Sequence, residues 1–313
     1  MADTAPAVTL ADLGGWPGIL GPLTSGLDLA SEQTEAAMAE ILAGNATSAQ
    51  IAGFIVALRM KGETAGELRG LLTAMRAAGE RVPVDPAGLV DVVGTGGDRS
   101  HSINVSSLAA LVVAGAGVRV CKHGNRAASS ACGSADVLDA LGVAIELGPD
   151  DVARCVTEAG IGFCFAPRFH PAMRHVVPTR RELGVPTVFN SLGPMANPAG
   201  VLRQVIGVAD WGLARRMIEV LASLGSEHIL VVHGHDQLDE LTTTTTSSVL
   251  ELHAGEVREY EVDPTALGLT LADPSELRGS DAIANADAGR RVLAGELGPH
   301  RDVVVLNAAA GMV

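Results

Sequence analysis

From residue 88 onward, short apolar runs alternate with stretches of helical spacing, and this alternation most constrains the fold. Runs of four or five residues are long enough for buried strands but too short for ordinary helices. Strands that are separated by helices predict a largely parallel sheet covered on both faces. The expected strands are Leu89–Val93, Val118–Cys121, Val143–Glu146, Gly162–Phe165, Val205–Val208, Ile229–Val232 and Val303–Leu306.

The first eighty residues have the pattern of helices instead. Thr47–Gln50 and Thr64–Glu67 both fit the capping box, in which a hydroxyl and a later Gln or Glu satisfy backbone amides reciprocally. Apolar residues follow each cap at helical spacing, and an earlier helix is expected to begin near Ser31. Aromatic residues make up only 3% of the chain, so the core is expected to consist of aliphatic side chains.

These patterns predict an α/β protein with a small all-helical N-terminal domain and a larger α/β domain with a mostly parallel central sheet. We expect the helical domain to span residues 1–84 and the α/β domain residues 85–313. Helical spacing returns between Pro167 and Gly184, so this segment is expected to join the helical domain. A ligand cleft is expected between the two domains, where such clefts commonly form.

A glycine-rich loop, Gly94-Thr95-Gly96-Gly97-Asp98, follows the first expected strand and precedes an apolar helix. Glycines let the backbone approach a ligand closely, and successive amides at a helix N-terminus attract phosphate. The loop matches neither the Gly-x-Gly-x-x-Gly pattern nor the Walker A pattern. Taken alone, it fits an anion site and also an ordinary tight turn with Asn104 or Ser106 as the helix cap.

A second polar loop, with the sequence KHGNRAASS at residues 122–130, follows the next expected strand. It combines two cations, an amide and two hydroxyls. Because the carboxyl ends of parallel strands meet at one edge of a sheet, both loops are expected at that edge, where ligands collect. Ser134 is expected to cap the next helix, which closes at Gly142. Two such loops together favour a site for a phosphate-bearing ligand.

Asp239 and Glu240 form an acidic pair after the expected strand Ile229–Val232. Mg²⁺ is typically held by one or two carboxylates together with substrate phosphates. An isolated acidic pair on a loop is usually solvated surface charge. Beside two phosphate-suited loops, this pair is a candidate metal site.

The formal net charge of -14 argues against nucleic acid and anionic membranes as partners, since both bind mainly through basic patches. Residues 94–126 are an exception, with four basic residues and one acidic residue, which suits a small anionic ligand. No segment has the pattern of a leader or a membrane span, and the four cysteines lack C-x-x-C pairing, so a cytoplasmic location is expected. After residue 306 the chain reads as a helix start, which suggests a truncated C-terminus.

The motifs together resemble the anthranilate phosphoribosyltransferases of tryptophan biosynthesis, in the nucleoside phosphorylase-like phosphoribosyltransferase family. Six motifs in order carry the resemblance, which reaches from the N-terminal helices to about residue 310. They are the glycine loop, Asn104–Ser107, KHGNRAASS, the segment from Gly133 to Gly142, the FNSLGP segment from Phe189 with Asn197-Pro198, and Asp239-Glu240.

The resemblance implies a Mg²⁺-dependent homodimer that binds phosphoribosyl pyrophosphate and anthranilate. Ser106, Asp239 and Glu240 would serve Mg²⁺, and Gly94, Asn125 and Arg180 would contact anthranilate. The residues implied to bind phosphoribosyl pyrophosphate are Gly94, Gly97, Asp98, Ser102, Asn104, Val105, Ser106, Ser107, Lys122, His123, Gly124, Asn125, Arg126, Ala127, Ala128, Ser129, Ser130 and Ser134.

The implied reaction joins the anthranilate amine to C1 of the ribosyl unit and releases pyrophosphate. The amine is already a nucleophile, so the barrier lies mainly in separating the pyrophosphate. Lys122, Mg²⁺ and backbone amides are therefore expected to stabilise the leaving group. His123 could accept the amine proton or could only order its loop. Two other functions stay open: a non-catalytic relative that binds nucleic acid, and a nucleoside phosphorylase that uses phosphate.

Overall fold

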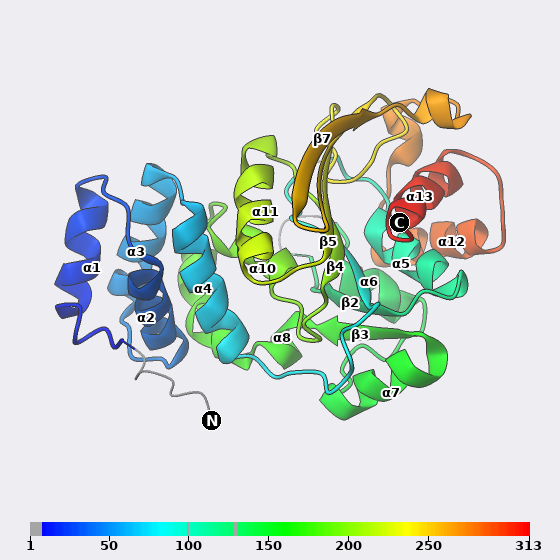
Figure 1. The fold of residues 1–313 in the computed structure, drawn as a ribbon. Helices are drawn as coiled ribbons and strands as arrows, with labels where there is room; N and C mark the ends of the chain where they lie inside the picture. Colours follow the sequence, from blue (N-terminus) through cyan, green and yellow to red (C-terminus); the bar gives the residue numbers. More distant parts are fainter. Residues whose placement is uncertain (1–7, 99, 128–130) are drawn as a thin grey trace. The chain divides into compact units, whose positions relative to one another are not determined.

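The structure is a computed structural model that describes residues 8–98, 100–127 and 131–313 (Figure 1). Its internal contacts group these residues into two compact units. Unit 1 holds the described residues up to Gly79 together with His170–Ala196, and unit 2 holds Glu80–Phe169 together with Asn197–Val313. Within the described residues, no helix is both long and apolar enough to cross a membrane.

Unit 1 is helical, as the spacing predicts. Its elements are α1 (Gly15–Thr24), α2 (Ser31–Leu42), α3 (Ser48–Lys61), α4 (Ala65–Ala77), the short 3₁₀ turn η1 (Pro171–His175), α9 (Val177–Leu183) and α10 (Phe189–Met195). Both predicted capping boxes are confirmed. Thr47 accepts a hydrogen bond from the Gln50 amide and Thr64 accepts one from the Glu67 amide, and each later side chain accepts one in return.

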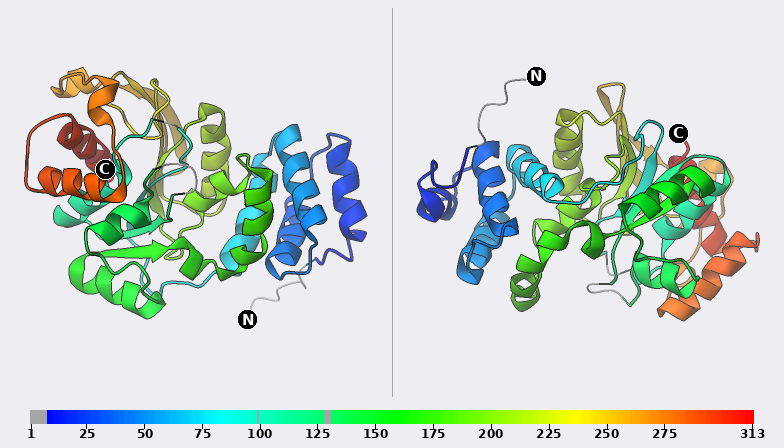
Figure 2. Two further views of the ribbon diagram at one scale, coloured as in Figure 1. Left: turned by 180° about the vertical axis from the view of Figure 1, so that it is seen from behind. Right: turned by 90° about the horizontal axis from the view of Figure 1, so that it is seen from below.

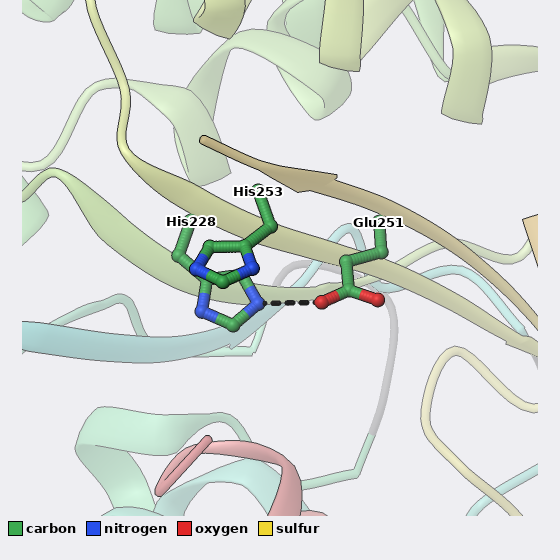
Figure 3. A group of neighbouring side chains, drawn as sticks. All are labelled: His228, Glu251 and His253. Carbon is green, nitrogen blue, oxygen red and sulfur yellow. Dashed lines mark hydrogen bonds and ion pairs between the residues drawn. The ribbon is translucent and has the colours of Figure 1, made fainter. Parts of the chain in front are cut away.

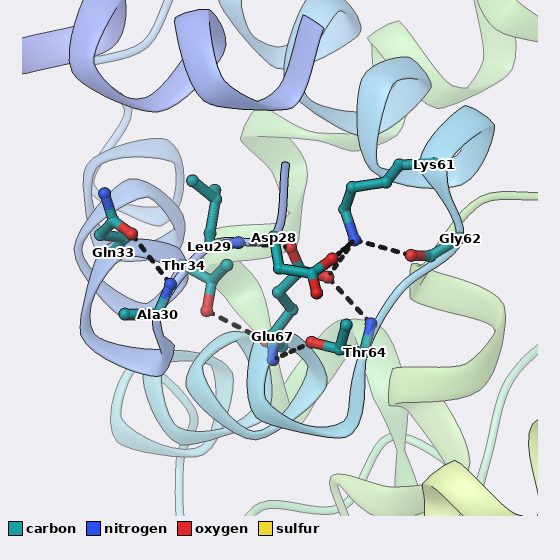
Figure 4. Close-up of polar contacts among 9 residues, drawn as sticks. All are labelled: Asp28, Leu29, Ala30, Gln33, Thr34, Lys61, Gly62, Thr64 and Glu67. Carbon is teal, nitrogen blue, oxygen red and sulfur yellow. Dashed lines mark hydrogen bonds and ion pairs between the residues drawn. The ribbon is translucent and has the colours of Figure 1, made fainter. Parts of the chain in front are cut away.

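The second capping box extends into a buried ion network (Figure 4). The Glu67 side chain is fully buried, and its Oε1 accepts a hydrogen bond from the Leu29 amide at 2.9 Å. Its Oε2 accepts from the Thr64 amide at 2.8 Å and from Lys61 Nζ at 2.9 Å. Burial alone would lower the pKa of Lys61, but hydrogen bonds to Asp28 and Glu67 raise it. Both oxygens of the buried carboxylate are therefore satisfied, and the network fixes the start of α4.

The described part of unit 2 holds a seven-stranded sheet in the order β3-β2-β1-β4-β5-β6-β7. The first five strands are parallel, and β6 and β7 are antiparallel additions at one edge. The strands are β1 (Val90–Gly94), β2 (Val120–Gly124), β3 (Ile161–Phe165), β4 (Arg203–Gly207), β5 (His228–Gly234), β6 (Ser247–His253) and β7 (Glu256–Val262). The predicted fold class is thus confirmed.

Helices cover the sheet on both faces, with α11 on one side and α5, α12 and α13 on the other (Figures 1 and 2). The helical elements of unit 2 are α5 (Val105–Gly115), α6 (Ser134–Ala140), α7 (Pro149–Ala159), α8 (Ala166–Phe169), η2 (Trp211–Leu213) and α11 (Ala214–Ser223), followed after the last strand by η3 (Pro264–Leu267), η4 (Pro274–Leu277), α12 (Ala282–Leu293) and α13 (Pro299–Ala310). The core between sheet and helices is aliphatic, as expected.

Two of the seven predicted strands are wrong. Val143–Glu146 is an unpaired connection between α6 and α7. Val303–Leu306 lies within α13, where Val303 and Val304 pack into the core and Val305 faces outward. A run of β-branched residues favours a strand, but burial against α5 overrides that preference here. The predicted helix start after residue 306 is instead the last turn of α13.

The hairpin of β6 and β7 was not among the predicted strands. The β-branched run Thr242–Thr246 precedes β6 rather than forming it. β7 has the sequence EVREYEV and is exposed along its length, so it lacks the apolar run that marks a buried strand. Its charged edge residues suit an exposed outer strand.

The strand order reverses at β1, which lies between β2 and β4. From β1 the chain first adds β2 and β3 on one side, and then returns to add β4 and β5 on the other. In such sheets ligands bind outside the carboxyl ends of the strands at this switch point. Gly94 and Gly207 are the paired last residues of β1 and β4, so they mark the place in this fold.

Candidate active site

Asp239 lies directly over the two glycines at the switch point. A Cβ atom on Gly94 would lie 2.4 Å from Asp239 Oδ2, and one on Gly207 would lie 1.6 Å from the Asp239 carbonyl oxygen. Asp239 Oδ2 accepts a hydrogen bond from the Gly96 amide at 2.7 Å. The first glycine of the loop therefore makes room for a protein carboxylate, and one loop amide is already occupied by it.

Glu240 is buried beside Asp239 and is only partly satisfied. Its Oε1 accepts a hydrogen bond from the Ser106 amide, 3.1 Å away at the start of α5. Its Oε2 is buried and has no hydrogen-bond partner among the described residues. Burial raises the pKa of Glu240 to about 7, although Lys122 and the bond from Ser106 act in the opposite direction. An oxygen left in this state is suited to an external cation.

Three carboxylates affect one another at this place. Burial raises the pKa of Asp239 well above its usual value, and the nearby charges of Glu240 and Asp98 raise it further. Carboxylate oxygens of this kind are the ligands that Mg²⁺ takes in proteins, and a bound cation would reverse the local repulsion. The predicted metal ligands Asp239 and Glu240 are thus adjacent, buried and chemically suited to Mg²⁺, while Ser106 is tied to Glu240 through its amide.

Lys122 is buried on β2 rather than lying in an open polar loop. It is on β2, is 2% exposed, and donates a hydrogen bond from Nζ to the Val92 carbonyl at 2.5 Å. Burial lowers the pKa of Lys122, and the negative charges of Asp91 and Glu240 oppose that shift. The ammonium group is therefore the buried counter-charge of the two acids. Its predicted contact with a leaving group stays a prediction.

Asp91 is a site residue that the sequence analysis missed. It is fully buried on β1, where its two oxygens accept hydrogen bonds from the His123 amide at 3.2 Å and from Asn197 Nδ2 at 2.8 Å. Burial raises the pKa of Asp91 to about 6, against the effect of Lys122. The available signal was a single acid inside an apolar strand. The His123 side chain is buried as well, so a direct role in proton transfer stays a prediction.

The start of α5 is held by side chains of the predicted binding set. Asn104 is the N-cap position, but its amide donates to the Cys132 carbonyl rather than capping the helix. Val105 points into the core, so only its backbone can contact a ligand. Ser107 Oγ is buried without a hydrogen-bond partner in the described part of the chain. Ser102 pairs with Arg278 in an isolated β-bridge.

The glycine loop itself has the backbone that its composition predicts. Gly96 and Gly97 have φ values of 69° and 84°, in the region that favours glycine. The Asp98 side chain accepts a hydrogen bond from Ser100 Oγ at 2.5 Å and faces Asp239.

The second loop is stabilised from within by Asp136 of α6. Asp136 Oδ2 accepts hydrogen bonds from the amides of Ala127 and Gly133, both at 2.9 Å. Arg126 forms ion pairs with Asp136 and Asp139, so its guanidinium is turned to these acids. Gly124 is the last residue of β2. In the loop that follows, Asn125 Oδ1 accepts a hydrogen bond from the backbone amide of residue 126 at 2.8 Å.

The helix after this loop begins differently from the prediction. Ser134 is the first residue of α6, and the N-cap position is Gly133, so Ser134 is not the cap. The Asp136 carboxylate accepts from the Gly133 amide instead. The predicted binding residues Ala128, Ser129 and Ser130 lie outside the described residues.

Arg180 belongs to unit 1, on α9. Its guanidinium donates to Asn190 Oδ1 at 3.3 Å and lies 5.2 Å from the centre of the Phe189 ring. Burial lowers the pKa of Arg180 from its usual value. Phe189 and Asn190 open the FNSLGP motif, so that motif orients the arginine. This role was not predicted, because the contact joins α9 to α10.

Comparison with known proteins gives the class first. A family model described as "Glycosyl transferase family, helical bundle domain" matches residues 17–79, and one described as "Glycosyl transferase family, a/b domain" matches residues 86–313. These are the helical and α/β parts of the molecule, in that order. The chain is thus a member of this glycosyl transferase family.

Within that family, highly similar relatives are named anthranilate phosphoribosyltransferase. The protein from Rhodococcus jostii (strain RHA1) is 57% identical over 297 residues, 95% of this chain and 82% of the relative. The one from Salinispora arenicola (strain CNS-205) is 54% identical over 300 residues, 95% of this chain and 85% of the relative. The chain belongs to the anthranilate phosphoribosyltransferases.

Solved structures agree with this assignment. The anthranilate phosphoribosyltransferase from Thermus thermophilus matches with a TM-score of 0.88 at 44% identity, covering 94% of this chain and 88% of that one. The Saccharomyces cerevisiae enzyme, solved in complex with PRPP and Mg, matches with a TM-score of 0.85 at 27% identity, covering 94% and 86%. The resemblance stated from the sequence motifs is confirmed.

Proposed function

We propose that the chain transfers the 5-phosphoribosyl group of phosphoribosyl pyrophosphate to the amine of anthranilate, giving N-(5-phosphoribosyl)anthranilate and pyrophosphate for tryptophan biosynthesis. One observation carries the proposal. Glu240 Oε2 is buried beside Asp239 at the switch point of the sheet, and it has no hydrogen-bond partner among the described residues. The names of the relatives, and the complex of the yeast enzyme with PRPP and Mg, support the same reaction.

Asp239 and Glu240 would hold Mg²⁺ in this proposal, and Ser106 would complete the set or orient Glu240. When bound, Mg²⁺ supplies positive charge that offsets the charge of the departing pyrophosphate. The chain's own part is to fix the geometry. The Gly96 amide donates a hydrogen bond to Asp239, and the Ser106 amide donates one to Glu240. The positive charge of Lys122 opposes the negative charge of Glu240.

Phosphoribosyl pyrophosphate is proposed to bind over the glycine loop and the start of α5. Amides at this helix N-terminus suit phosphate. The backbone of the loop after β2 would continue the site, while the Arg126 guanidinium stabilises that loop through Asp136 and Asp139. The predicted contact of Arg126 with phosphoribosyl pyrophosphate, which involves the backbone of this loop, stays a prediction.

Anthranilate is proposed to contact Gly94, Asn125 and Arg180. An arginine can clamp a carboxylate through two parallel hydrogen bonds. Asn190 and Phe189 hold the guanidinium on one side and restrict its rotation. We further propose that units 1 and 2 are the two domains of the chain, and that the protein is a cytoplasmic homodimer.

The direct test is to follow the loss of anthranilate fluorescence with phosphoribosyl pyrophosphate, with and without Mg²⁺. The proposal predicts Mg²⁺-dependent loss of fluorescence and release of one pyrophosphate per anthranilate consumed. A nucleoside phosphorylase would instead require inorganic phosphate and a nucleoside. Activity only under those conditions, or no reaction with anthranilate, would overturn the proposal.

A further inference from the structure

A second cluster of metal-ligating side chains lies on β5 and β6 (Figure 3). In the part of the chain that the structure describes, His228, Glu251 and His253 form a group whose ligand atoms all lie within 4.8 Å of one another. His228 is the first residue of β5, whereas Asp239 lies over the carboxyl ends of β1 and β4. The cluster is therefore at the amino end of β5, whereas the proposed active site is at the carboxyl ends of the parallel strands.

The sheet itself brings the three side chains together. His228 and His253 are directly paired across β5 and β6. Glu251 lies two residues before His253 on β6, and residues at this spacing point to the same face of a sheet. The two imidazole rings are stacked, with centroids 4.4 Å apart and an angle of 24° between their planes. The arrangement is thus set by rigid strands rather than by a loop.

The contacts already resemble those of a site in which a proton takes the place of a metal. His228 Nε2 and Glu251 Oε1 are 2.9 Å apart and share one hydrogen bond. Two ligand atoms at a tetrahedral zinc, each about 2.0–2.1 Å from the metal, are about 3.3 Å apart. A small separation of the pair, with rotation of the exposed His253 ring out of the stack so that its nitrogen lone pair points at the same place, would admit the ion, and the shared proton would be released to solvent.

Neighbouring groups prepare Glu251 for this role. Arg258 donates to Glu251 Oε2 at 3.2 Å, which leaves Oε1 directed at His228. The Arg258 side chain is itself 61% exposed, so it can adjust when a cation binds.

The cluster is also accessible. His253 is exposed, and both histidines line a surface hollow together with Ser226, Glu227 and Gly255. An ion could enter from solvent and keep a fourth position for water. Two imidazoles and one carboxylate suit zinc and similar transition metals, whereas Mg²⁺ prefers oxygen ligands only.

We propose that His228, Glu251 and His253 form a binding site for a transition-metal ion of the zinc type, distinct from the proposed Mg²⁺ site. The ion would link β5 to β6 near the amino end of β5. This site goes beyond the transferase reaction, and it stands or falls independently of it.

The test measures Zn²⁺ binding, without any activity assay. The full chain is stripped with a chelator, dialysed into excess Mg²⁺ to occupy the acidic pair, and titrated with Zn²⁺ in competition with a chromophoric chelator. We expect one tight site per chain. His253→Ala should weaken it by at least about 10-fold, because loss of even an outer partner of a metal ligand costs about 10–100-fold in affinity.

His235→Ala is the matched control, since His235 lies just after β5 but contacts Ser248 and Thr246 instead of the cluster. It should bind Zn²⁺ like the wild type. Because His253 is exposed, its replacement should leave the fold intact, and thermal melting checks this. Equal Zn²⁺ affinity in the wild type and His253→Ala, or no tight Zn²⁺ site in the wild type, would overturn the proposal.

Discussion

Glu67 in unit 1 and Glu240 in unit 2 are both buried glutamates, yet they have opposite surroundings. Glu67 accepts hydrogen bonds from the Leu29 and Thr64 amides and from Lys61, so each oxygen is satisfied within the protein. Glu240 accepts one backbone hydrogen bond, and its Oε2 has no hydrogen-bond partner in the described residues.

This difference distinguishes a buried carboxylate that stabilises the fold from one that is open to a ligand. A buried charge costs several kcal/mol unless it is paired and hydrogen-bonded. At Glu67 the partners recover that cost and the network stabilises the helical unit. At Glu240 the free-energy cost of burying the carboxylate is only partly offset by protein partners. A ligand that supplies positive charge can offset the rest when it binds. Substitutions at the two positions should therefore have opposite effects on stability and activity.

The largest expected change in stability is at Glu67. Glu67→Ala should lower the free energy of unfolding by about 3–5 kcal/mol, because the Leu29 and Thr64 amides lose their acceptor and buried Lys61 loses one of its two carboxylate partners. Activity per folded molecule should be unchanged. Glu32→Ala, an exposed acid in the first turn of α2, is the control and should cost about 1 kcal/mol or less. Denaturant unfolding of both variants checks this. Equal losses would mean that the network adds nothing.

The complementary change is Glu240→Gln, which keeps the shape and removes the charge. We expect the transfer rate to fall by about 10²–10³-fold, as when one charge-stabilising group is removed from an active site. The free energy of unfolding at pH 7 should stay the same or increase, since a poorly compensated charge is removed. Steady-state kinetics and denaturant unfolding are both needed. A loss of stability like that of Glu67→Ala would erase the contrast between the two glutamates.

The pH dependence of stability sharpens the comparison through Asp91. Its pKa is raised to about 6 in the folded protein, from 3.8. Between these values the folded state binds more protons than the unfolded state, so this group's stabilising contribution is full below about pH 4 and is lost as the pH rises through about 6. Asp91→Asn removes the effect.

The variant should therefore gain stability relative to the wild type as the pH rises from 4 to 6.5, by up to about 3 kcal/mol. Unfolding curves at several pH values, measured for both proteins, test this. A difference that does not depend on pH would show that Asp91 does not titrate in this range.

The smallest expected effect is steric. Gly94→Ala would place a Cβ 2.4 Å from Asp239 Oδ2 and should cost about 1–3 kcal/mol, with weaker Mg²⁺ binding. Gly115→Ala is the matched control, because no atom lies within 4 Å of its added Cβ. It should be neutral, or stabilise α5 by up to about 1 kcal/mol. Thermal melting with and without Mg²⁺ distinguishes the two variants, and equal shifts would contradict the crowding at Asp239.

Local signals predicted the parts of these regions that depend on neighbours in sequence. The capping box of Thr64 and Glu67 spans four residues, and the glycine loop lies between a strand and a helix, so the sequence alone predicted both. The bond from Leu29 to Glu67 joins residues 38 apart and was not. Likewise, the acidic pair was recognised, but the packing of Asp239 against Gly94 and Gly207 joins residues far apart in the sequence and was not.

The errors have the same origin. Val303–Leu306 was assigned to a strand because it is a short apolar run, whereas its packing against α5 is helical. Lys122 was placed in a polar loop, but strand pairing extends to Gly124 and buries its side chain. Asp91 and Asn197 are 106 residues apart, and no local pattern joins them. Local patterns thus identified the site, while long-range contacts decide what each residue does there.

The central claim is that Glu240 is left unsatisfied for a metal that binds with the sugar pyrophosphate. Calorimetric titration of phosphoribosyl pyrophosphate, with and without Mg²⁺, tests it most directly in the wild type and in Glu240→Gln. We predict that Mg²⁺ strengthens binding in the wild type, and that the variant loses at least about 10-fold of this enhancement, equivalent to about 1.4 kcal/mol. The same Mg²⁺ dependence in both proteins would contradict the account.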